Sequence, residues 1–181
     1  MPTGYVAYAT SSTTIPQREN YVYHRNNLSQ FSSVGPGWRD LTVAGAPDPR
    51  VPVVYTGHPG SDGYTPQWNQ LKFTSGSARI RLASWVEAQL IIAEARGGQD
   101  AIDAMNRVRS DYGLPPVASG DLATVLEERR REFFSEGQVH GDMVRHGIPF
   151  PSGVNHKGQI YQDLTCIPLP DVETLNNPNI P

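Results

Sequence analysis

The densest group of residues capable of chemistry is the run Glu128–Glu132, which reads ERRRE. Arginine presents a planar fork of donors, so this run could bind an anion or a carboxylate. The simpler interpretation is that Glu and Arg pair along the surface of a helix. One inward-facing arginine could also join Asp142 and Arg145 in a buried network that holds helix ends without taking part in catalysis.

Four aromatic residues in loop-like sequence form a second candidate group, Trp38, Tyr55, Tyr64 and Trp68. The C–H face of a sugar ring packs on an aromatic plane while nearby polar groups bond its hydroxyls, so these side chains are candidate ligand-binding residues. They equally suit the task of pinning long loops to helices, and this is the simpler interpretation.

The remaining patterns point to no reaction. The five histidines have no metal-ligand spacing, so we expect no metal and no cofactor. The single cysteine, Cys166, lies in an apolar run, which predicts a buried and inert thiol. The sequence has no nucleophile elbow, P-loop or dinucleotide fingerprint. It does not show whether two carboxylates face each other across a cleft, so an acid/base hydrolase is an unsupported alternative.

The elements that must position these residues are helices, expected over residues 84–96, 99–112 and 121–136, with a further short helical segment at 140–146. Ser84 and Glu87 have the spacing of a capping box, in which each residue bonds the backbone N–H of the other. A Gly-Gly corner ends the first helix and makes the first two antiparallel, as an αα-hairpin. Asp121 is expected to cap the third helix and Gly137 to end it.

Each helix has an apolar stripe that we expect to be buried. Residues three and four positions apart share one helical face, which defines the stripe. The predicted buried positions are, in chain order, Ala88, Ile91, Ile92 and Ala95, then Ile102, Met105, Val108 and Tyr112, then Leu122, Val125, Leu126, Arg129 and Phe133.

The rest of the chain is rich in loops, because most of its 17 glycines and 16 prolines lie outside the helical stretch. Short strands are expected at Tyr5–Tyr8 and at Tyr21–Tyr23. The run Val51–Val54 suits only an edge strand, since Pro52 interrupts it. The apolar segment Leu164–Leu169 is expected to pack back onto the helices.

Size and charge exclude several classes of protein. The chain has 181 residues, enough for one domain with a real core. A net charge of -3 gives no reason to expect nucleic acid. No stretch approaches the roughly 20 apolar residues that a membrane span needs. The N-terminus does not have the pattern of a secretory signal, so the protein is cytosolic, has lost its signal, or is a piece of a longer chain.

Several blocks of sequence, in this order, resemble the C-terminal region of the SusD/RagB family of nutrient-binding outer-membrane lipoproteins. The segments DPRVPVVYTG and DGYTPQWNQLKF resemble stretches that precede the helices in one branch of the family. The five blocks themselves are RLASWVEAQLIIAEA, the Gly-rich corner, NRVRSDYGLPP, LEERRREFFSEGQVHGDMVRHG and CIPLPDVETLNNPNI.

The resemblance implies a mainly α fold with extensive loops and little β structure. A tetratricopeptide-like αα-hairpin and a further helix would be covered by an irregular, loop-rich layer. The chain would form a single SusD-like region, with a loop-rich layer at 1–80, a helical scaffold at 81–146 and a loop-rich C-terminal segment at 147–181.

The resemblance also implies a non-catalytic role at the cell surface. Family members capture oligosaccharide or another nutrient and work with a SusC-type TonB-dependent outer-membrane transporter. They are lipid-anchored in the outer membrane, although the anchoring cysteine is not present in this chain. The alternative is a structural, self-assembling surface module, in which the exposed helical face binds copies of itself or another surface protein instead of a ligand. If the chain is a fragment, the missing N-terminal portion of the same chain is a further expected partner.

A recurring family pattern, E-R-R-x-E…E-G…G-D-x-x-R, falls on the candidate charge cluster and on two glycines, Gly137 and Gly141. We interpret the charged members as a structural ion network at the ends of the last helices. They are Glu128, Arg129, Arg130, Glu132, Glu136, Asp142 and Arg145.

Overall fold

A computed structural model describes residues 3–15, 17–154, 158 and 160 of the chain. The chain divides into two units, Met1–Val139 and His140–Pro181, and each is described by itself. The predicted packing of Leu164–Leu169 and the predicted burial of Cys166 lie outside the described residues.

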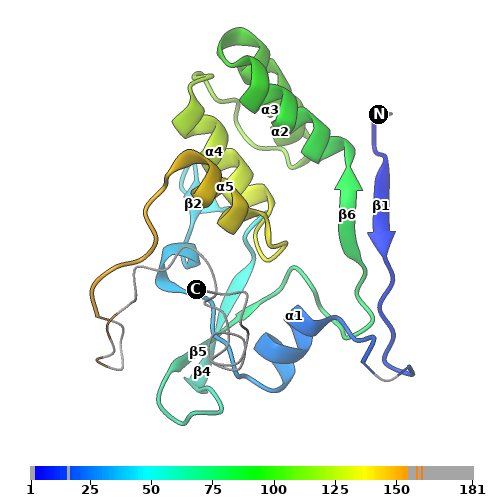
Figure 1. Ribbon diagram of the computed structural model, residues 1–181, viewed down its shortest axis with the longest axis vertical. Coiled ribbons are helices and arrows are strands. Elements are labelled where there is room, and N and C mark those ends of the chain that lie inside the picture. Colours follow the sequence, from blue (N-terminus) through cyan, green and yellow to red (C-terminus); the bar gives the residue numbers. More distant parts are fainter. Residues whose placement is uncertain (1–2, 16, 155–157, 159, 161–181) are drawn as a thin grey trace, which may run out of the picture. The chain divides into compact units, whose positions relative to one another are not determined.

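The described part is mainly α with small antiparallel sheets and long loops (Figure 1). Short elements occupy the N-terminal half and longer helices follow. The strands are β1 Val6–Ala9, β2 Thr42–Val43, β3 Ala46–Pro47, β4 Val53–Pro59, β5 Pro66–Gln70 and β6 Ile80–Ser84. The helices are α1 Tyr21–Tyr23, the π-helix η1 His24–Leu28, the 3-10 helix η2 Pro36–Trp38, α2 Trp85–Arg96, α3 Gly98–Asp111, α4 Leu122–Glu132 and α5 Gln138–His146.

The strands form three two-stranded antiparallel sheets, β1 with β6, β2 with β3 and β4 with β5. Strand β1 begins one residue later than predicted, and its partner β6 runs directly into α2 (Figure 1). In the β4–β5 hairpin Tyr55 lies opposite Trp68, before the register shifts ahead of Pro59. Gly57 lies in that irregular stretch with φ +84, a conformation that glycine adopts without strain.

The strand predicted at Tyr21–Tyr23 is wrong, because these residues form helix α1. Asn20 is fully buried, and its Oδ1 accepts the N–H of Tyr23 at 3.0 Å. Its Nδ2 donates to the carbonyl oxygen of Ala78 at 3.0 Å. The buried cap therefore selects a helical turn over the β preference of the aromatic residues.

The three long helices lie where they were predicted, with one difference in length. Ser84 Oγ accepts the N–H of Glu87 at 3.1 Å, which is the first half of the predicted capping box, while Glu87 Oε1 accepts a hydrogen bond from Gln138 Nε2 at 3.2 Å. Asp121 caps α4 as predicted. Helix α4 ends at Glu132 and not at Glu136, because the following turn takes Ser135 to φ +61.

The main core of the first unit lies among α2, α3 and α4. Three alanines in it are fully buried, and their small side chains let α2 and α3 approach closely. Phe133, just past the end of α4, is also buried in this core. The cluster consists of Leu90, Ala93, Ala101, Ala104, Met105, Val108, Val125 and Phe133.

The predicted buried face of α2 is wrong. Ile91 is 53% exposed and Ile92 is 36% exposed, and Ala95 is exposed beside them. The buried side chains belong to Trp85, Gln89, Leu90 and Ala93, one step around the helix. The prediction for α4 is mixed, since Val125, Arg129 and Phe133 are buried whereas Leu122 is exposed.

The second unit contains most of α5, which starts two residues earlier than the segment predicted at 140–146. Asp142 Oδ1 accepts a hydrogen bond from Arg145 Nη2 at 2.8 Å. The rings of His140 and Phe150 lie 5.3 Å apart. Among the described residues, every helix is too short or too polar to cross a bilayer.

Candidate functional site

Tyr55 and Trp68 form an aromatic pair on one face of the β4–β5 hairpin. They are directly opposed across the two strands, so alternation places both side chains on the same face. Their ring centroids are 5.2 Å apart with the planes tilted by 33°. Tyr55 is 47% exposed, and Trp68 is partly buried. The pair therefore combines one exposed aromatic ring, that of Tyr55, with the partly buried ring of Trp68.

Trp38 and Trp68 both pack against a second, smaller core that contains Val34, Val51 and Phe134. The Trp38 ring lies 5.2 Å from that of Phe134. These two tryptophans thus have the contacts expected of loop anchors. Trp68 is nevertheless only partly buried.

Tyr64, the fourth candidate, lies outside this cluster. It belongs to the turn between β4 and β5 and is 68% exposed. Asp62 shapes that turn, since its Oδ1 accepts the backbone N–H groups of Tyr64 and Thr65. The structure therefore brings together three of the four predicted aromatic residues and leaves Tyr64 apart.

Two arginines lie over the tryptophan rings. The guanidinium carbon of Arg39 lies 4.9 Å from the Trp68 ring centroid, and that of Arg130 lies 4.5 Å from the Trp38 centroid. Such stacking is favourable because the face of an aromatic ring is electronegative. The sequence analysis missed Arg39, because its ring partner is 29 residues away (68 − 39) and no spacing rule joins them.

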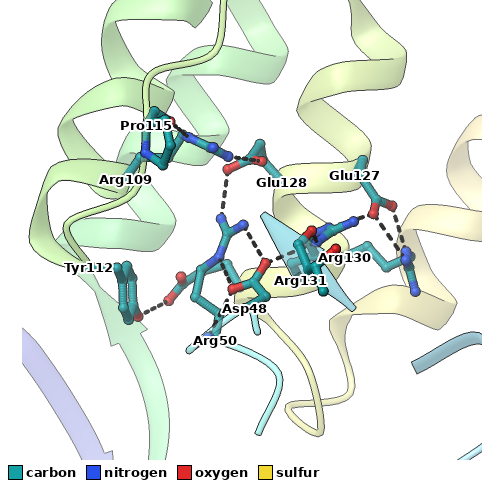
Figure 2. A network of polar contacts seen from close by, with 11 residues as sticks. Asp48, Arg50, Arg109, Tyr112, Pro115, Glu127, Glu128, Arg130 and Arg131 are labelled. Carbon is teal, nitrogen blue, oxygen red and sulfur yellow. Dashed lines mark hydrogen bonds and ion pairs between the residues drawn. The ribbon is translucent and has the colours of Figure 1, made fainter. Parts of the chain in front are cut away.

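The ERRRE helix contributes to a buried ion network around Glu128 (Figure 2). Arg50 Nη1 donates to Glu128 Oε2 at 2.6 Å, and Arg109 Nη1 donates to Glu128 Oε1 at 2.6 Å. Arg50 also donates to both carboxylate oxygens of Asp48, at 3.0 and 2.8 Å. Arg131 Nη1 reaches the same Asp48 at 3.1 Å. The network thus joins the loop at residues 48–50 to α3 and α4.

A second group of charges extends the network past the end of α4. Arg81 binds Glu132 Oε1 at 3.0 Å and Glu136 Oε1 at 2.9 Å. Lys72 Nζ reaches Glu136 Oε1 at 2.8 Å, and the Tyr112 hydroxyl donates to Glu132 Oε1 at 3.0 Å. Burial and the neighbouring carboxylate of Glu132 raise the pKa of Tyr112, so this hydroxyl stays a donor. Strand β6 and the stretch after β5 are tied to α4 in this way.

The charge run is therefore divided between the interior and the surface. Glu128, Arg129 and Glu132 are buried. Arg130 and Arg131 pair with Glu127 along the helix, at 2.6 Å in each case. The interpretation that Glu and Arg pair along the helix surface therefore holds for Arg130 and Arg131, but not for the buried residues of the ERRRE run.

The predicted ion network differs in membership from the observed one. Glu128, Glu132 and Glu136 belong to it, whereas Arg129 pairs with Glu94 at 3.3 Å. Asp142 and Arg145 pair with each other in the second unit. Its other members, which sequence reasoning missed, are Asp48, Arg50, Lys72, Arg81, Arg109 and Tyr112. No local spacing connects them to α4, so the sequence carries no signal for these pairings.

Acid should weaken the network at Asp48. Burial alone would raise the pKa of Asp48, but hydrogen bonds from Arg50 and Arg131 outweigh burial and lower the pKa to about 2. An unfolded Asp titrates near pKa 3.9, so this carboxylate contributes its full stability only above about pH 4. We expect that contribution to be lost as the pH falls from about 4 toward 2.

Urea unfolding at pH 6 and at pH 3 measures this dependence. Wild-type protein should lose more stability between the two pH values than Asp48→Asn, in which the titrating carboxylate is already absent. Asp100→Asn, a change at an exposed residue, should follow the wild type. Equal losses in wild type and Asp48→Asn would contradict the assignment.

The described residues contain no group of three or more His, Cys, Asp and Glu side chains that could hold a metal ion. The candidate surface consists of the aromatic rings of Tyr55 and Trp68 with the neighbouring guanidinium of Arg39. The model for the SusD family matches residues 8–178, and the chain therefore belongs to this family, which confirms the resemblance seen in the sequence. Searches among curated proteins and solved structures gave no match.

Proposed function

We propose that this protein is a non-catalytic, cell-surface binding protein for oligosaccharide or another nutrient. The family match over residues 8–178 supports a role in nutrient binding. The observation that supports a particular binding surface is the aromatic pair of Tyr55, which is exposed, and Trp68, which is partly buried. An aromatic surface of this kind fits the C–H face of a sugar ring.

The proposal includes a partner and a location. In this role the protein works with a SusC-type TonB-dependent transporter and is held at the outer membrane by a lipid anchor. The helical part would serve as a tetratricopeptide-like scaffold, built on the αα-hairpin of α2 and α3. The ion network would be architectural, because its arginines already pair with carboxylates of the protein.

One observation favours a second candidate function, a structural or self-assembling surface module. Helix α2 exposes Ile91 and Ile92, and β6 exposes Leu82 just before it. Exposed apolar side chains on neighbouring elements suit contact with another protein surface. Size measurement in dilute solution separates the two candidates, because a monomer that binds sugar supports the receptor and a concentration-dependent oligomer without sugar affinity supports the module.

Removal of the aromatic surface should weaken ligand binding. We expect Trp68→Ala and Tyr55→Ala each to lower glycan affinity about three- to tenfold, the effect of losing one aromatic contact. Retention on a panel of immobilised glycans measures the change. Phe31→Ala is the control, since Phe31 is an exposed aromatic residue that belongs to neither core cluster. Unchanged retention in the double variant would remove the site.

A further inference from the structure

Arg39 differs from the other stacked arginine of the aromatic surface in how its nitrogens are used. Arg130 is fully engaged, since its three nitrogens donate to Glu127 and to the carbonyl oxygen of Gly37. Arg39 uses only its Nε in a hydrogen bond, which it donates to the carbonyl oxygen of Val34 at 2.8 Å. This bond and the stacking on Trp68 fix the plane of the guanidinium.

The two terminal nitrogens of Arg39 make no hydrogen bond with any residue in the described part of the chain. Burial lowers the pKa of Arg39, and the neighbouring Asp40 only partly offsets that effect. The guanidinium remains a cation whose charge lacks the close carboxylate partner that Arg50, Arg81 and Arg109 have. A guanidinium in this state offers a planar pair of donors to an external anion.

We propose that the surface formed by Tyr55, Trp68 and Arg39 recognises an acidic sugar, and that the terminal nitrogens of Arg39 bind the carboxylate of a uronic acid residue. This inference rests on the proposed function and names the class of nutrient. The exposed ring of Tyr55 receives the C–H face of the sugar, because Arg39 already covers a face of the Trp68 ring. The guanidinium carbon of Arg39 lies 4.9 Å from the Trp68 ring centroid, and the Tyr55 ring lies 5.2 Å from the same tryptophan, so the fork and the exposed ring belong to one surface. A planar carboxylate matches the two parallel donors of the fork.

The test compares ligands that carry either a charged carboxylate or its neutral methyl ester. Trimers of galacturonic acid and of mannuronic acid, and the same trimers as methyl esters, are titrated into the full chain by calorimetry. Hydrogen bonds to charged groups are worth roughly 1.5–3 kcal/mol, so the acid form should bind about 10- to 100-fold more tightly than its ester. Arg39→Gln should abolish this preference, so that acid and ester bind with equal affinity. Asp40→Asn, which removes the competing carboxylate, should strengthen binding of the acid form.

Arg25→Gln is the matched control, because Arg25 also stacks on aromatic rings, those of Tyr21 and Phe31. This variant should keep the preference for acidic sugar. Circular dichroism and the unfolding midpoint establish that Arg39→Gln is folded. Equal affinity of the wild type for acid and ester overturns the acidic-sugar inference and leaves the proposed function standing. If neither form binds and Trp68→Ala has no effect on the glycan panel, both fail.

Discussion

Glu128→Ala should lower the free energy of unfolding by about 3–5 kcal/mol, the cost of breaking a buried ion pair by removing one partner. Glu128 accepts hydrogen bonds from Arg50 and Arg109, and all three side chains are buried. Truncation leaves two guanidinium groups facing each other without their shared carboxylate. Their repulsion adds to the cost of keeping each cation out of water.

Urea unfolding of the purified chain at neutral pH measures this loss. Arg96→Ala is the matched control, because Arg96 pairs with Asp100 at 3.3 Å with both side chains more than half exposed. An exposed pair contributes about 1 kcal/mol or less, so the control should stay close to the wild type. A loss of under 1 kcal/mol in Glu128→Ala would show that the network does not hold the fold together.

The second large effect is expected at Gly120, where the chain passes over the start of α3. Gly98 N–H donates to the Gly120 carbonyl oxygen at 3.0 Å. A Cβ added at Gly120 would lie 1.9 Å from the backbone oxygen of Gly98. Backbone cannot rotate away as a side chain does, so Gly120→Ala must push the two segments apart. We expect a loss of about 3 kcal/mol, at the upper end for overpacked sites.

Gly37→Ala is the control for this substitution. A Cβ at Gly37 meets nothing within 4 Å, and its φ lies outside the left-handed region. This change should leave the free energy of unfolding unchanged or raise it slightly, since alanine restricts the unfolded chain. Thermal unfolding of both variants gives the comparison. Equal midpoints for Gly120→Ala and the wild type would mean that the loop at Gly120 moves to accept the Cβ without any loss of stability.

Local signals in the sequence were sufficient to place the helices. Ser84, Asp121 and the Gly97–Gly98 corner act through backbone atoms within four residues, so their effect can be read from spacing alone. Asn20 has the same kind of local effect, but the aromatic residues that follow favoured the wrong prediction of a strand. Its burial and its bond to Ala78, which lies 58 residues away, decide the outcome.

The buried face of α2 could not be read from hydrophobicity. Ile91 and Ile92 are its most apolar residues, yet the core side selects Leu90 and Ala93. Close approach of α3 favours the small side chain of Ala93 at the contact, and the face that contains Ala93 also buries Leu90. The aromatic surface was partly predictable, because residue type alone suggested Tyr55 and Trp68. Arg39 could be identified as a member of this surface only from the tertiary structure, which places its guanidinium over Trp68.

The buried pairing of Arg50 with Glu128 also sets an order of events during synthesis. The two residues are 78 positions apart, so the loop at residues 48–50 leaves the ribosome long before its carboxylate partner exists. Until α4 is made, Arg50 has Asp48 beside it but neither Glu128 nor the shelter of the helices. The contact between this loop and α4 can therefore form only after α4 has been made, and contacts over such separations are slow to form. A chain that ends before α4 has no Glu128 for Arg50 to bind, whereas the β2–β3 and β4–β5 sheets pair within the first half of the chain.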